Sequence, residues 1–322
     1  MSGAGLLVPW YSDAPMYDLI IVGGGPAGAA AAVYAARKQL KTVLIVQEWG
    51  GQSNVSTDIH NWIGTPAISG AELAKALRTH TEQYQGDFLT IKFPSTAKKL
   101  EASTDKVVVT TDKGESFEAK SLLITTGSRR RKLDVPGAAE FDQKGLTYCA
   151  SCDGPLFGGQ DVAVVGGGNA GFESALQLLA YCRKVYLLNR TEMFRADEIT
   201  VAAAKAHPNM EILLNAVPTE VVGGPFVKAL KYKDTKTGEE KTLDVTGIFI
   251  EIGLLPNSEW LGDVVKLNEI KQVVVDPTTQ KTSHPRIWAA GDVTDGMYHQ
   301  NNIAAGEAVT ALEDIYMALK RG

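Results

Sequence analysis

The sequence predicts an α/β protein made of two three-layer dinucleotide-binding domains, the second inserted into the first. Three observations lead to this prediction. A strand–glycine turn–helix–strand pattern occurs twice, at residues 17–46 and 161–189. The chain of 322 residues is long for a single hydrophobic core. A segment at residues 248–257 carries glycine and proline where the chain would return from the inserted domain.

The first domain is expected to follow an N-terminal arm, residues 1–15, which lacks the basic start and apolar length of a signal peptide. Residues 17–46 then read as strand, tight turn, Ala-rich helix and strand. Both apolar strand runs are short and continuous, as in a parallel sheet with both faces covered by helices. Residues 106–111 and 116–125 are expected to be strands, because the turn sequence DKG lies between them.

The second domain is expected after a linker at residues 127–137, which are polar and basic and contain a proline. On the far side, residues 287–293 predict a strand that ends in Gly-Asp, and a helix is expected near residues 302–320. The predicted boundaries are an arm at 1–15, a discontinuous first domain at 16–127 and 254–322, and an inserted domain at 128–253.

The composition limits the possible partners. The chain is 44% apolar and 21% charged, with a formal net charge of -5, as in ordinary globular proteins. Nucleic acid usually requires a basic surface, and the run RRRK at residues 129–132 is better explained as a solvated linker face. No apolar run approaches the roughly 20 residues that cross a bilayer. We therefore expect a cytoplasmic protein with neither nucleic acid nor membrane as a partner.

The first fingerprint is Gly23-x-Gly25-x-x-Gly28, in which Pro26 and Ala27 precede the third glycine. The first glycine makes a tight turn, the second lets a pyrophosphate approach the backbone, and the third permits close packing of helix on strand. The N-terminus of the helix adds the positive end of its dipole. The pattern alone is weak, but its strand–turn–helix setting favours a dinucleotide site over a structural turn.

The second fingerprint, Gly166-x-Gly168-x-x-Gly171, has the same setting, with Asn169 at the start of its helix. Two fingerprints in one chain indicate a flavin-dependent pyridine nucleotide oxidoreductase or a close relative. One nucleotide is then FAD, and the other is ordinarily NAD(P)H. Two Rossmann-like domains are therefore the expected architecture.

The choice of electron donor should depend on the end of the strand after the second fingerprint, where an acidic residue would favour NADH. The sequence has Asn189 and Arg190 there, with Arg195 five residues on, and no carboxylate ends the strand. Two arginines can bind a ribose 2′-phosphate, so NADPH is favoured. The alternative is that both arginines are solvated surface side chains.

The two cysteines Cys149 and Cys152 form a C-x-x-C pair just before the second fingerprint. In a cytosolic chain such a pair is more often catalytic or metal-binding than structural. The pair can interconvert between dithiol and disulfide, and a thiolate is the attacking species. Asp153 follows directly and is either a proton donor and acceptor or a turn or N-cap residue.

Zinc is the competing interpretation of the cysteine pair, and a closed structural site needs four ligands. The third cysteine, Cys182, stands alone in an apolar helix. The histidines show no ligand spacing; they are His60, His80, His207, His284 and His299. No metal is expected.

With these motifs the chain resembles the low-molecular-weight thioredoxin reductases and the flavoprotein portion of the alkyl hydroperoxide reductase F subunit. The resemblance covers residues 17 to about 318 and depends on motifs that occur in the right order. The motifs are GGGPAGAAAAVYAAR, GGQ at 50–52, TDIHNWIG at 57–64, TTG at 125–127, CASCDGPLF, GGGNAG, GIFIEIGLLPN and AAGDV.

The resemblance implies an FAD site, a redox dithiol and a homodimer. The implied FAD residues are Gly23, Gly25, Pro26, Ala27, Gly28, Gly51, Gln52, Asn61, Gly127, Gly291, Asp292 and Gln300. Cys152 would face the flavin, Cys149 would attack the disulfide of a separate thioredoxin-fold protein, and Asp153 would be the acid–base residue. The inserted domain would rotate, so that nicotinamide and dithiol take turns at the flavin.

The sequence departs from the resembled family at three places. NADPH-using members show His-Arg-Arg with a further arginine, whereas this chain has Asn189, Arg190 and Thr191 with Arg195; Gly171 also replaces a common alanine. His299 and Asn301 replace the arginine and alanine that commonly flank the flavin glutamine. Some relatives use NADPH poorly or take electrons from ferredoxin.

The sequence therefore predicts FAD-dependent reduction of a thioredoxin-like disulfide, with NADPH as the favoured donor. One alternative keeps this chemistry and takes electrons from NADH or reduced ferredoxin. Another is a flavin-bound redox sensor whose dithiol records the redox state without turnover. Activity with each donor distinguishes these hypotheses.

Overall fold

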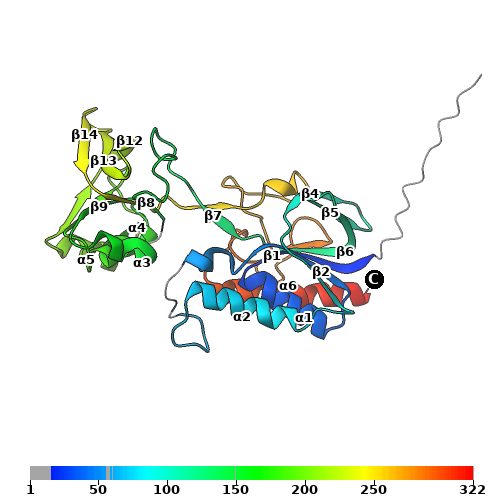
Figure 1. Cartoon of the computed structure of the whole chain (residues 1–322). Helices are drawn as coiled ribbons and strands as arrows, with labels where there is room; N and C mark the ends of the chain where they lie inside the picture. The colour runs from blue at the N-terminus through cyan, green and yellow to red at the C-terminus, as the bar shows by residue number, and fades with distance from the viewer. Residues whose placement is uncertain (1–15, 56–58, 60, 149, 322) are drawn as a thin grey trace, which may run out of the picture. The chain divides into compact units, whose positions relative to one another are not determined.

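The computed structural model describes residues 16–55, 59, 61–148 and 150–321 (Figure 1). The expected arm at residues 1–15 and the cysteine Cys149 lie outside the described residues. The chain divides into two compact units. Unit 1 comprises Met1–Gly51, Ala76–Gly127 and Asn257–Gly322, and unit 2 comprises Gln52–Lys75 and Ser128–Pro256.

The units differ from the predicted domains at two places. Residues 52–75 were predicted in the first domain but group with unit 2, where the Gln52 side-chain amide donates to the Ser128 carbonyl at 2.5 Å. The return to unit 1 comes after Pro256 rather than after residue 253. The reason is that residues 254–256 pair with residues 128–130 as strands and so belong with them.

In the described part of unit 1, seven strands form one sheet in the order β3-β2-β1-β6-β5-β4, with β17 pairing with β6. The strands are β1 (Tyr17–Gly24), β2 (Thr42–Trp49), β3 (Leu89–Lys92), β4 (Ala97–Ala102), β5 (Val107–Thr111), β6 (Ser116–Ile124) and β17 (Ile287–Ala289). The neighbours among β3, β2, β1, β6 and β17 are parallel, while β4 and β5 extend the sheet antiparallel. The strands predicted at residues 106–111 and 116–125 are thereby confirmed.

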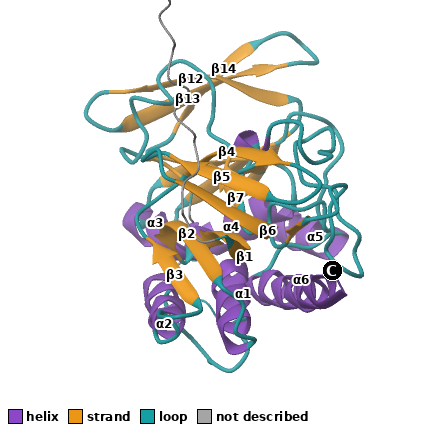
Figure 2. Ribbon diagram, turned by 90° about the vertical axis from the view of Figure 1, so that its right-hand side faces the viewer, coloured by secondary structure: helices purple, strands orange, loops and turns teal. Residues whose placement is uncertain are grey.

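Alternate residues of β1 face two different hydrophobic cores. Leu19 and Ile21 pack with alanines of α1 (Pro26–Arg37) and α6 (Asn301–Arg321), which lie side by side in Figure 2. Ile20 and Val22 pack on the other face, with β5 and the 3-10 helix η3 (Glu259–Leu261). Every residue of this strand interior is therefore apolar, as the sequence indicated. Helix α2 (Gly70–Glu82) belongs to this unit from Ala76 onward.

Unit 2 contains a parallel sheet whose described strands run in the order β11-β10-β9-β15-β8. They are β8 (Leu146–Thr147), β9 (Asp161–Val165), β10 (Lys184–Leu188), β11 (Met210–Leu213) and β15 (Gly247–Ile250). On one face, Val162 and Val164 pack against α4 (Asn169–Leu178) and α5 (Glu198–Ala206). The second strand–turn–helix–strand prediction is confirmed by β9, α4 and β10.

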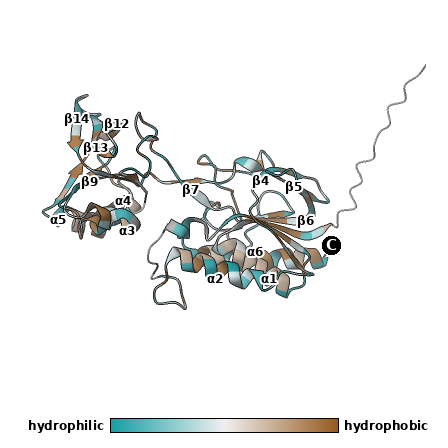
Figure 3. Ribbon diagram, in the orientation of Figure 1, coloured by the Kyte–Doolittle hydropathy of each residue, from teal (hydrophilic) through white to brown (hydrophobic). Residues whose placement is uncertain are grey.

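The other face of this sheet is covered by an antiparallel meander that the sequence analysis did not predict. It consists of β12 (Ala216–Gly223), β13 (Val227–Asp234) and β14 (Glu240–Asp244). Ala163 and Val165 of β9 share a core with residues of β12 and β13. The large sheet of each unit is thus covered on two faces, which is the predicted three-layer α/β class. Strands around β6 and β9 carry much of the hydrophobic colour in Figure 3.

Two short strands mark the segments that join the units. β7 (Ser128–Arg130) pairs antiparallel with β16 (Leu254–Pro256), so part of the linker expected at residues 127–137 is a two-stranded ribbon. The remaining helical segments are α3 (Ala150–Asp153) and the 3-10 helices η1 (Gly51–Val55) and η2 (Gly154–Phe157). Among the described helices none has the length and apolar composition of a membrane-spanning segment.

Candidate active site

The first fingerprint forms the junction of β1 and α1, and two of its glycines are required by the packing of the protein itself. A Cβ placed on Gly23, whose φ is +125°, would lie 2.2 Å from the carbonyl oxygen of Thr125. A Cβ on Gly28 would lie 1.8 Å from the carbonyl oxygen of Gly23. No side chain fits at either distance, so strand, turn and helix approach each other only through glycine.

Gly25 differs, because a Cβ placed on it would meet no described atom within 4 Å. Its φ of -78° is also open to any residue. Gly25 precedes Pro26 at the N-terminus of α1, and no side chain caps this end. An open space at an uncapped helix N-terminus suits a phosphate group, so these residues fit the pyrophosphate of FAD. Gly51 borders the same space, since its Cβ position lies 3.7 Å from the Cα of Gly25.

The Gly-Asp turn after β17 packs against this fingerprint. A Cβ on Gly291 would lie 3.5 Å from the Cβ of Ala27 and 3.2 Å from that of Ala304 on α6. The Gly291 N–H donates to the Glu307 carboxylate at 2.8 Å, which fixes the turn to α6. Burial raises the pKa of Asp292, the next residue, although the charge of His299 acts in the opposite sense. The structure therefore brings the predicted Gly291 and Asp292 to the first fingerprint.

The other predicted FAD residues fall in both units. Gly127, with a left-handed φ of +61°, and Gln300, which directly precedes α6, belong to unit 1. Gln52 and Asn61 belong to the segment that groups with unit 2. Each of these four assignments remains a prediction.

The second fingerprint forms the junction of β9 and α4. Its glycines also fall into two groups, those that the packing of the protein requires and one that has more space around it. A Cβ on Gly166 would lie 2.1 Å from the Glu251 carbonyl oxygen, and one on Gly171 would lie 2.0 Å from the Gly166 carbonyl oxygen. Gly168 is the less confined position: its nearest neighbour, the Arg195 carbonyl oxygen, is 3.6 Å away. No side chain caps α4 at Gly168, so this helix N-terminus also suits a phosphate.

The loop after β10 carries both predicted arginines and is tied to this fingerprint. The buried Asn189 amide donates to the carbonyls of Thr191 and Met193, at 2.9 and 3.0 Å, and so shapes the loop. The Arg195 N–H donates to the Gly167 carbonyl at 3.0 Å, which fixes the backbone of this exposed residue to the glycine turn. Arg190 is exposed on the same loop.

Asn169, the remaining predicted residue, ties the end of this loop to the fingerprint. Its side-chain oxygen accepts the Asp197 N–H at 2.7 Å. The loop is therefore attached to the glycine turn at Arg195 and to the first residue of α4 through Asp197.

The dithiol prediction falls mostly on residues outside the described set, since neither Cys149 nor the Cys152 side chain is described. The backbone of Cys152 belongs to α3, which contacts α4 of the second fingerprint. The carboxylate of Asp153 accepts a hydrogen bond from the Thr147 hydroxyl, and that hydroxyl accepts the Tyr148 N–H at 2.7 Å. Asp153 is thus positioned by the strand that precedes the cysteines.

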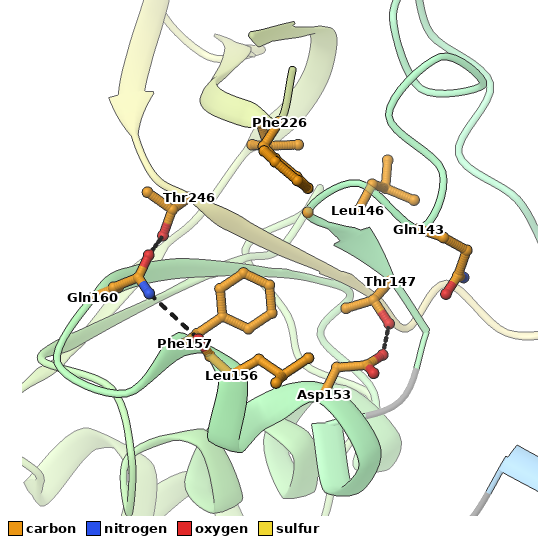
Figure 4. A pocket seen from close by; sticks show the side chains of 11 residues that line it. Gln143, Leu146, Thr147, Asp153, Leu156, Phe157, Gln160, Phe226 and Thr246 are labelled. Carbon is orange, nitrogen blue, oxygen red and sulfur yellow. Dashed lines mark hydrogen bonds between the residues drawn. The ribbon is translucent and has the colours of Figure 1, made fainter. Parts of the chain in front are cut away.

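Asp153 also lines a pocket of about 400 Å³ within unit 2 (Figure 4). The wall is largely apolar, with Leu156 73% and Phe226 65% exposed. The pocket residues are Gln143, Gly145, Leu146, Thr147, Asp153, Leu156, Phe157, Gln160, Phe226, Val227 and Thr246. An apolar recess therefore begins one residue after the C-x-x-C pair.

Sequence reasoning missed Thr147, Thr125, Glu251 and Glu307. Thr147 holds Asp153, Thr125 packs against Gly23, and the Glu251 backbone packs against Gly166. The quoted motifs include Thr125 and Glu251 but do not show their packing roles, because the partners of Thr125, Glu251 and Glu307 are distant along the chain. Thr147 lies only six residues before Asp153. Within the described residues, no group of three His, Cys, Asp or Glu side chains is arranged to hold a metal ion.

A comparison with known protein families identifies the group to which this arrangement belongs. The family described as pyridine nucleotide-disulphide oxidoreductase matches residues 17–312. The chain belongs to this family. Membership implies binding of a flavin and a pyridine nucleotide, in agreement with the two open fingerprints.

Solved structures agree with this membership. The thioredoxin reductase of Lactococcus lactis is 32% identical, with a TM-score of 0.82 over 95% of this chain and 100% of that chain. The thioredoxin reductase of T. acidophilum is 34% identical, with a TM-score of 0.78 over 94% of this chain and 98% of that chain. The resemblance to low-molecular-weight thioredoxin reductases and the fold class are thereby confirmed.

Curated relatives of this oxidoreductase are longer than the chain. NADH dehydrogenase of Bacillus subtilis is 39% identical over 309 residues, which cover 96% of this chain and 60% of that protein. The alkyl hydroperoxide reductase F subunit of Staphylococcus aureus is 41% identical over 295 residues, covering 92% and 57%. The chain thus spans somewhat over half the length of these relatives.

Proposed function

We propose that this oxidoreductase uses FAD and a reduced pyridine nucleotide to reduce the disulfide of a thioredoxin-fold protein through Cys149 and Cys152. One observation carries the proposal: the helix α3, which contains Cys152, contacts the helix α4 that begins at the second fingerprint. This contact supports a dithiol and a donor site within the same unit. The first fingerprint, in the other unit, fits FAD.

The residues of unit 1 would hold FAD by its pyrophosphate at the N-terminus of α1, over Gly25. Bound FAD supplies the two-electron step between a nicotinamide and a disulfide. In unit 2, the thiolate of Cys149 would attack the disulfide of the partner protein and form a mixed disulfide. Cys152 would then attack the Cys149 sulfur, which releases the reduced partner and leaves the Cys149–Cys152 disulfide. Asp153, held by Thr147, would accept or donate the proton.

The proposed donor is NADPH, because Arg190 and Arg195 lie on the loop that is tied to the second fingerprint. Guanidinium groups bind phosphate with charge-assisted hydrogen bonds. The runner-up is NADH, which the name of the Bacillus subtilis relative favours. Reduced ferredoxin is the third candidate.

The proposed partner surface includes the apolar pocket beside Asp153. Leu156 and Phe226 expose large apolar side chains there, and such surfaces are enriched at sites of protein contact. A homodimer and a cytoplasmic location are further parts of the proposal, taken from the family resemblance and the dithiol.

Anaerobic titration of the FAD-loaded protein with NADPH and then NADH tests the donor by bleaching of the flavin absorbance. We expect rapid stoichiometric bleaching by NADPH. Replacing Arg190 and Arg195 together by Ala should raise the KM for NADPH about tenfold or more, and that for NADH little, because each charged hydrogen bond contributes about 1.5–3 kcal/mol.

The matched control is Arg183→Ala, which removes an exposed arginine paired with Asp161 at the other end of β9. It should leave both KM values unchanged. Bleaching by NADH alone would overturn the choice of donor. Bleaching by dithionite but by neither nucleotide would overturn the pyridine nucleotide donor and make ferredoxin the next reagent.

A further inference from the structure

The strand order of unit 2 reverses at the second fingerprint. In the order β11-β10-β9-β15-β8, the chain runs from β9 outward to β10 and β11, and it returns later to β15 on the opposite side of β9. Nucleotides bind outside the carboxyl ends of parallel strands at such a reversal. The donor nucleotide of the proposed function is therefore expected across the ends of β10, β9 and β15.

The two halves of this nucleotide belong on opposite sides of β9. Arg190 and Arg195, the proposed ligands of the 2′-phosphate, lie on the loop after β10. The pyrophosphate belongs at the N-terminus of α4, where Gly168 has open space. An extended dinucleotide with its adenosine half over β10 and its pyrophosphate at α4 places its nicotinamide half over the end of β15.

The end of β15 carries Glu251, which is fixed to the glycine turn. The Glu251 N–H donates to the Val165 carbonyl at 2.8 Å, and a Cβ on Gly166 would lie 2.1 Å from the Glu251 carbonyl oxygen. The Glu251 side chain is 8% exposed and accepts a hydrogen bond from the Ser174 hydroxyl at 2.8 Å. The carboxylate thus joins the end of β15 to α4.

Arg130 brings a guanidinium to the same carboxylate. Its Nη1 donates to Glu251 at 2.9 Å, and its backbone is placed by the pairing of β7 with β16, in which Arg130 lies opposite Leu254. Arg130, Glu251 and the second fingerprint all belong to unit 2. One contact therefore separates Arg130 from Glu251, and one more separates Glu251 from Gly166.

The pair with Glu251 does not satisfy the guanidinium. A guanidinium carries several N–H donors, and among the described residues Glu251 is the one side-chain acceptor of Arg130. The Nε atom is buried without a partner among these residues. The side chain as a whole is 32% exposed, so part of the guanidinium is accessible to a ligand. With Nη1 on Glu251 and Nε buried, Nη2 is the nitrogen that can bind one.

We propose that Arg130 donates from Nη2 to the carboxamide oxygen of the bound nicotinamide and so positions the ring of the donor. The inference rests on pyridine nucleotide binding at the second fingerprint, as in the proposed function, and it names the residue that binds the reacting end. The carboxamide is the polar group of the nicotinamide ring, and its carbonyl oxygen accepts the kind of hydrogen bond that a guanidinium donates. Glu251 and Ser174 hold the guanidinium in place for this contact.

The test compares two ligands that differ by the nicotinamide ring. The first is tetrahydro-NADP, a ring-reduced analogue that keeps the carboxamide and transfers no hydride. The second is 2′-phospho-ADP-ribose, which keeps all the phosphates and both riboses and lacks the ring. Isothermal titration calorimetry measures their dissociation constants for the FAD-loaded protein. Where NADH is the donor, tetrahydro-NAD and ADP-ribose take their place.

Arg130→Lys separates the ligand contact from the structural role of Arg130. A lysine ammonium can pair with Glu251 but has no second nitrogen for the carboxamide. We expect this variant to bind tetrahydro-NADP about tenfold more weakly than the wild type, because it lacks one charge-assisted hydrogen bond. Its affinity for 2′-phospho-ADP-ribose should stay within about twofold of the wild-type value. Arg130→Met, which also loses the ion pair, should show the same difference between the ligands.

Two further variants are controls for this difference. Lys132→Met removes an exposed cation of the same segment, which pairs with Asp142 at 2.6 Å, and should change neither dissociation constant. Arg190→Ala should weaken the binding of both ligands, since both contain the 2′-phosphate.

The outcomes distinguish the two proposals. Failure of the wild-type protein to bind either pair of ligands would overturn the pyridine nucleotide donor of the proposed function. Binding by the wild type, with equal losses for both ligands in Arg130→Lys or with no loss for either, would overturn the role of Arg130 and leave the proposed function intact.

Discussion

At the scale of single residues, the glycines of each fingerprint have two different functions. Gly23, Gly28, Gly166 and Gly171 are required because a backbone carbonyl lies where a Cβ atom would stand. At Gly23 and Gly166 that carbonyl belongs to a distant residue, and at Gly28 and Gly171 it belongs to the first glycine of the same turn. Gly25 has free space around its Cβ position and an unrestricted φ, so the protein without a nucleotide does not require glycine there. We therefore expect the open space at Gly25 to admit a ligand.

This difference predicts opposite behaviour for two alanine substitutions. Gly28→Ala should destabilise the FAD-free protein by about 2–4 kcal/mol, because a methyl group overlaps the Gly23 carbonyl. Gly25→Ala should change its stability by less than about 0.5 kcal/mol and weaken FAD binding about tenfold or more. Thermal unfolding of the FAD-free protein and fluorescence titration with FAD measure the two effects. Equal losses of stability in both variants would contradict the distinction.

At the scale of elements, an ion pair joins the connecting strand β7 to the end of the central strand β15. Arg130 Nη1 lies 2.9 Å from the Glu251 carboxylate, whose side chain is 8% exposed, and Ser174 of α4 donates to the same carboxylate at 2.8 Å. Burial raises the pKa of Glu251 above 4.5, and the charge of Arg130 opposes this. The β7–β16 ribbon is thus attached to the fingerprint region of unit 2.

Removing the Arg130 guanidinium should lower the free energy of unfolding by an amount that depends on pH. A carboxyl group whose pKa is raised in the folded state contributes stability below its ordinary value of 4.5, and loses it as pH rises through the folded pKa. Arg130→Met raises that folded pKa further, so its loss of stability should be larger near pH ~7 than near pH ~5. We expect about 1–3 kcal/mol near neutral pH, reduced from a fully buried pair by the partial exposure of Arg130.

Urea unfolding at the two pH values measures this effect. The control is Lys132→Met, which breaks an exposed pair with Asp142 and should change stability by less than about 1 kcal/mol. An Arg130→Met loss that is the same at both pH values would show that buried charge is not its cause.

At the scale of the whole molecule, the two units have separate cores and separate fingerprints. Each nucleotide should therefore stabilise mainly its own unit. At a ligand concentration of about 100 times Kd, binding adds about 2.7 kcal/mol to the bound state. We expect FAD to slow amide hydrogen exchange in β1 and α1, and NADPH to slow it in β9 and α4.

Hydrogen-exchange mass spectrometry with each nucleotide alone measures this separation. Gly25→Ala is the internal control, because it should remove the FAD effect in β1 and α1 and leave the NADPH effect in β9 and α4. Protection of both units by NADPH alone would contradict separate sites.

Much of the fold follows from patterns that are local along the chain. The strands β1, β5, β6 and β9 and the helix α6 were predicted because their apolar runs and flanking turns are continuous in sequence. The meander β12–β14 was not, because its apolar positions gain meaning only against β9 and β15. Residues 52–75 were predicted in the first domain but group with unit 2, because no local pattern shows the contact between Gln52 and Ser128.

The sequence by itself determined the fold class and showed the two glycine fingerprints and the C-x-x-C pair, because each depends on residues spaced a few positions apart. Only the tertiary structure separated the glycines required by packing from those with open space. It also showed that Glu307 of α6 accepts a hydrogen bond from the Gly-Asp turn. Packing placed the Glu251 carboxylate between Arg130 of a strand and Ser174 of a helix. These properties depend on burial and on distances between distant residues, and both exist only after the sheet and its helices have packed.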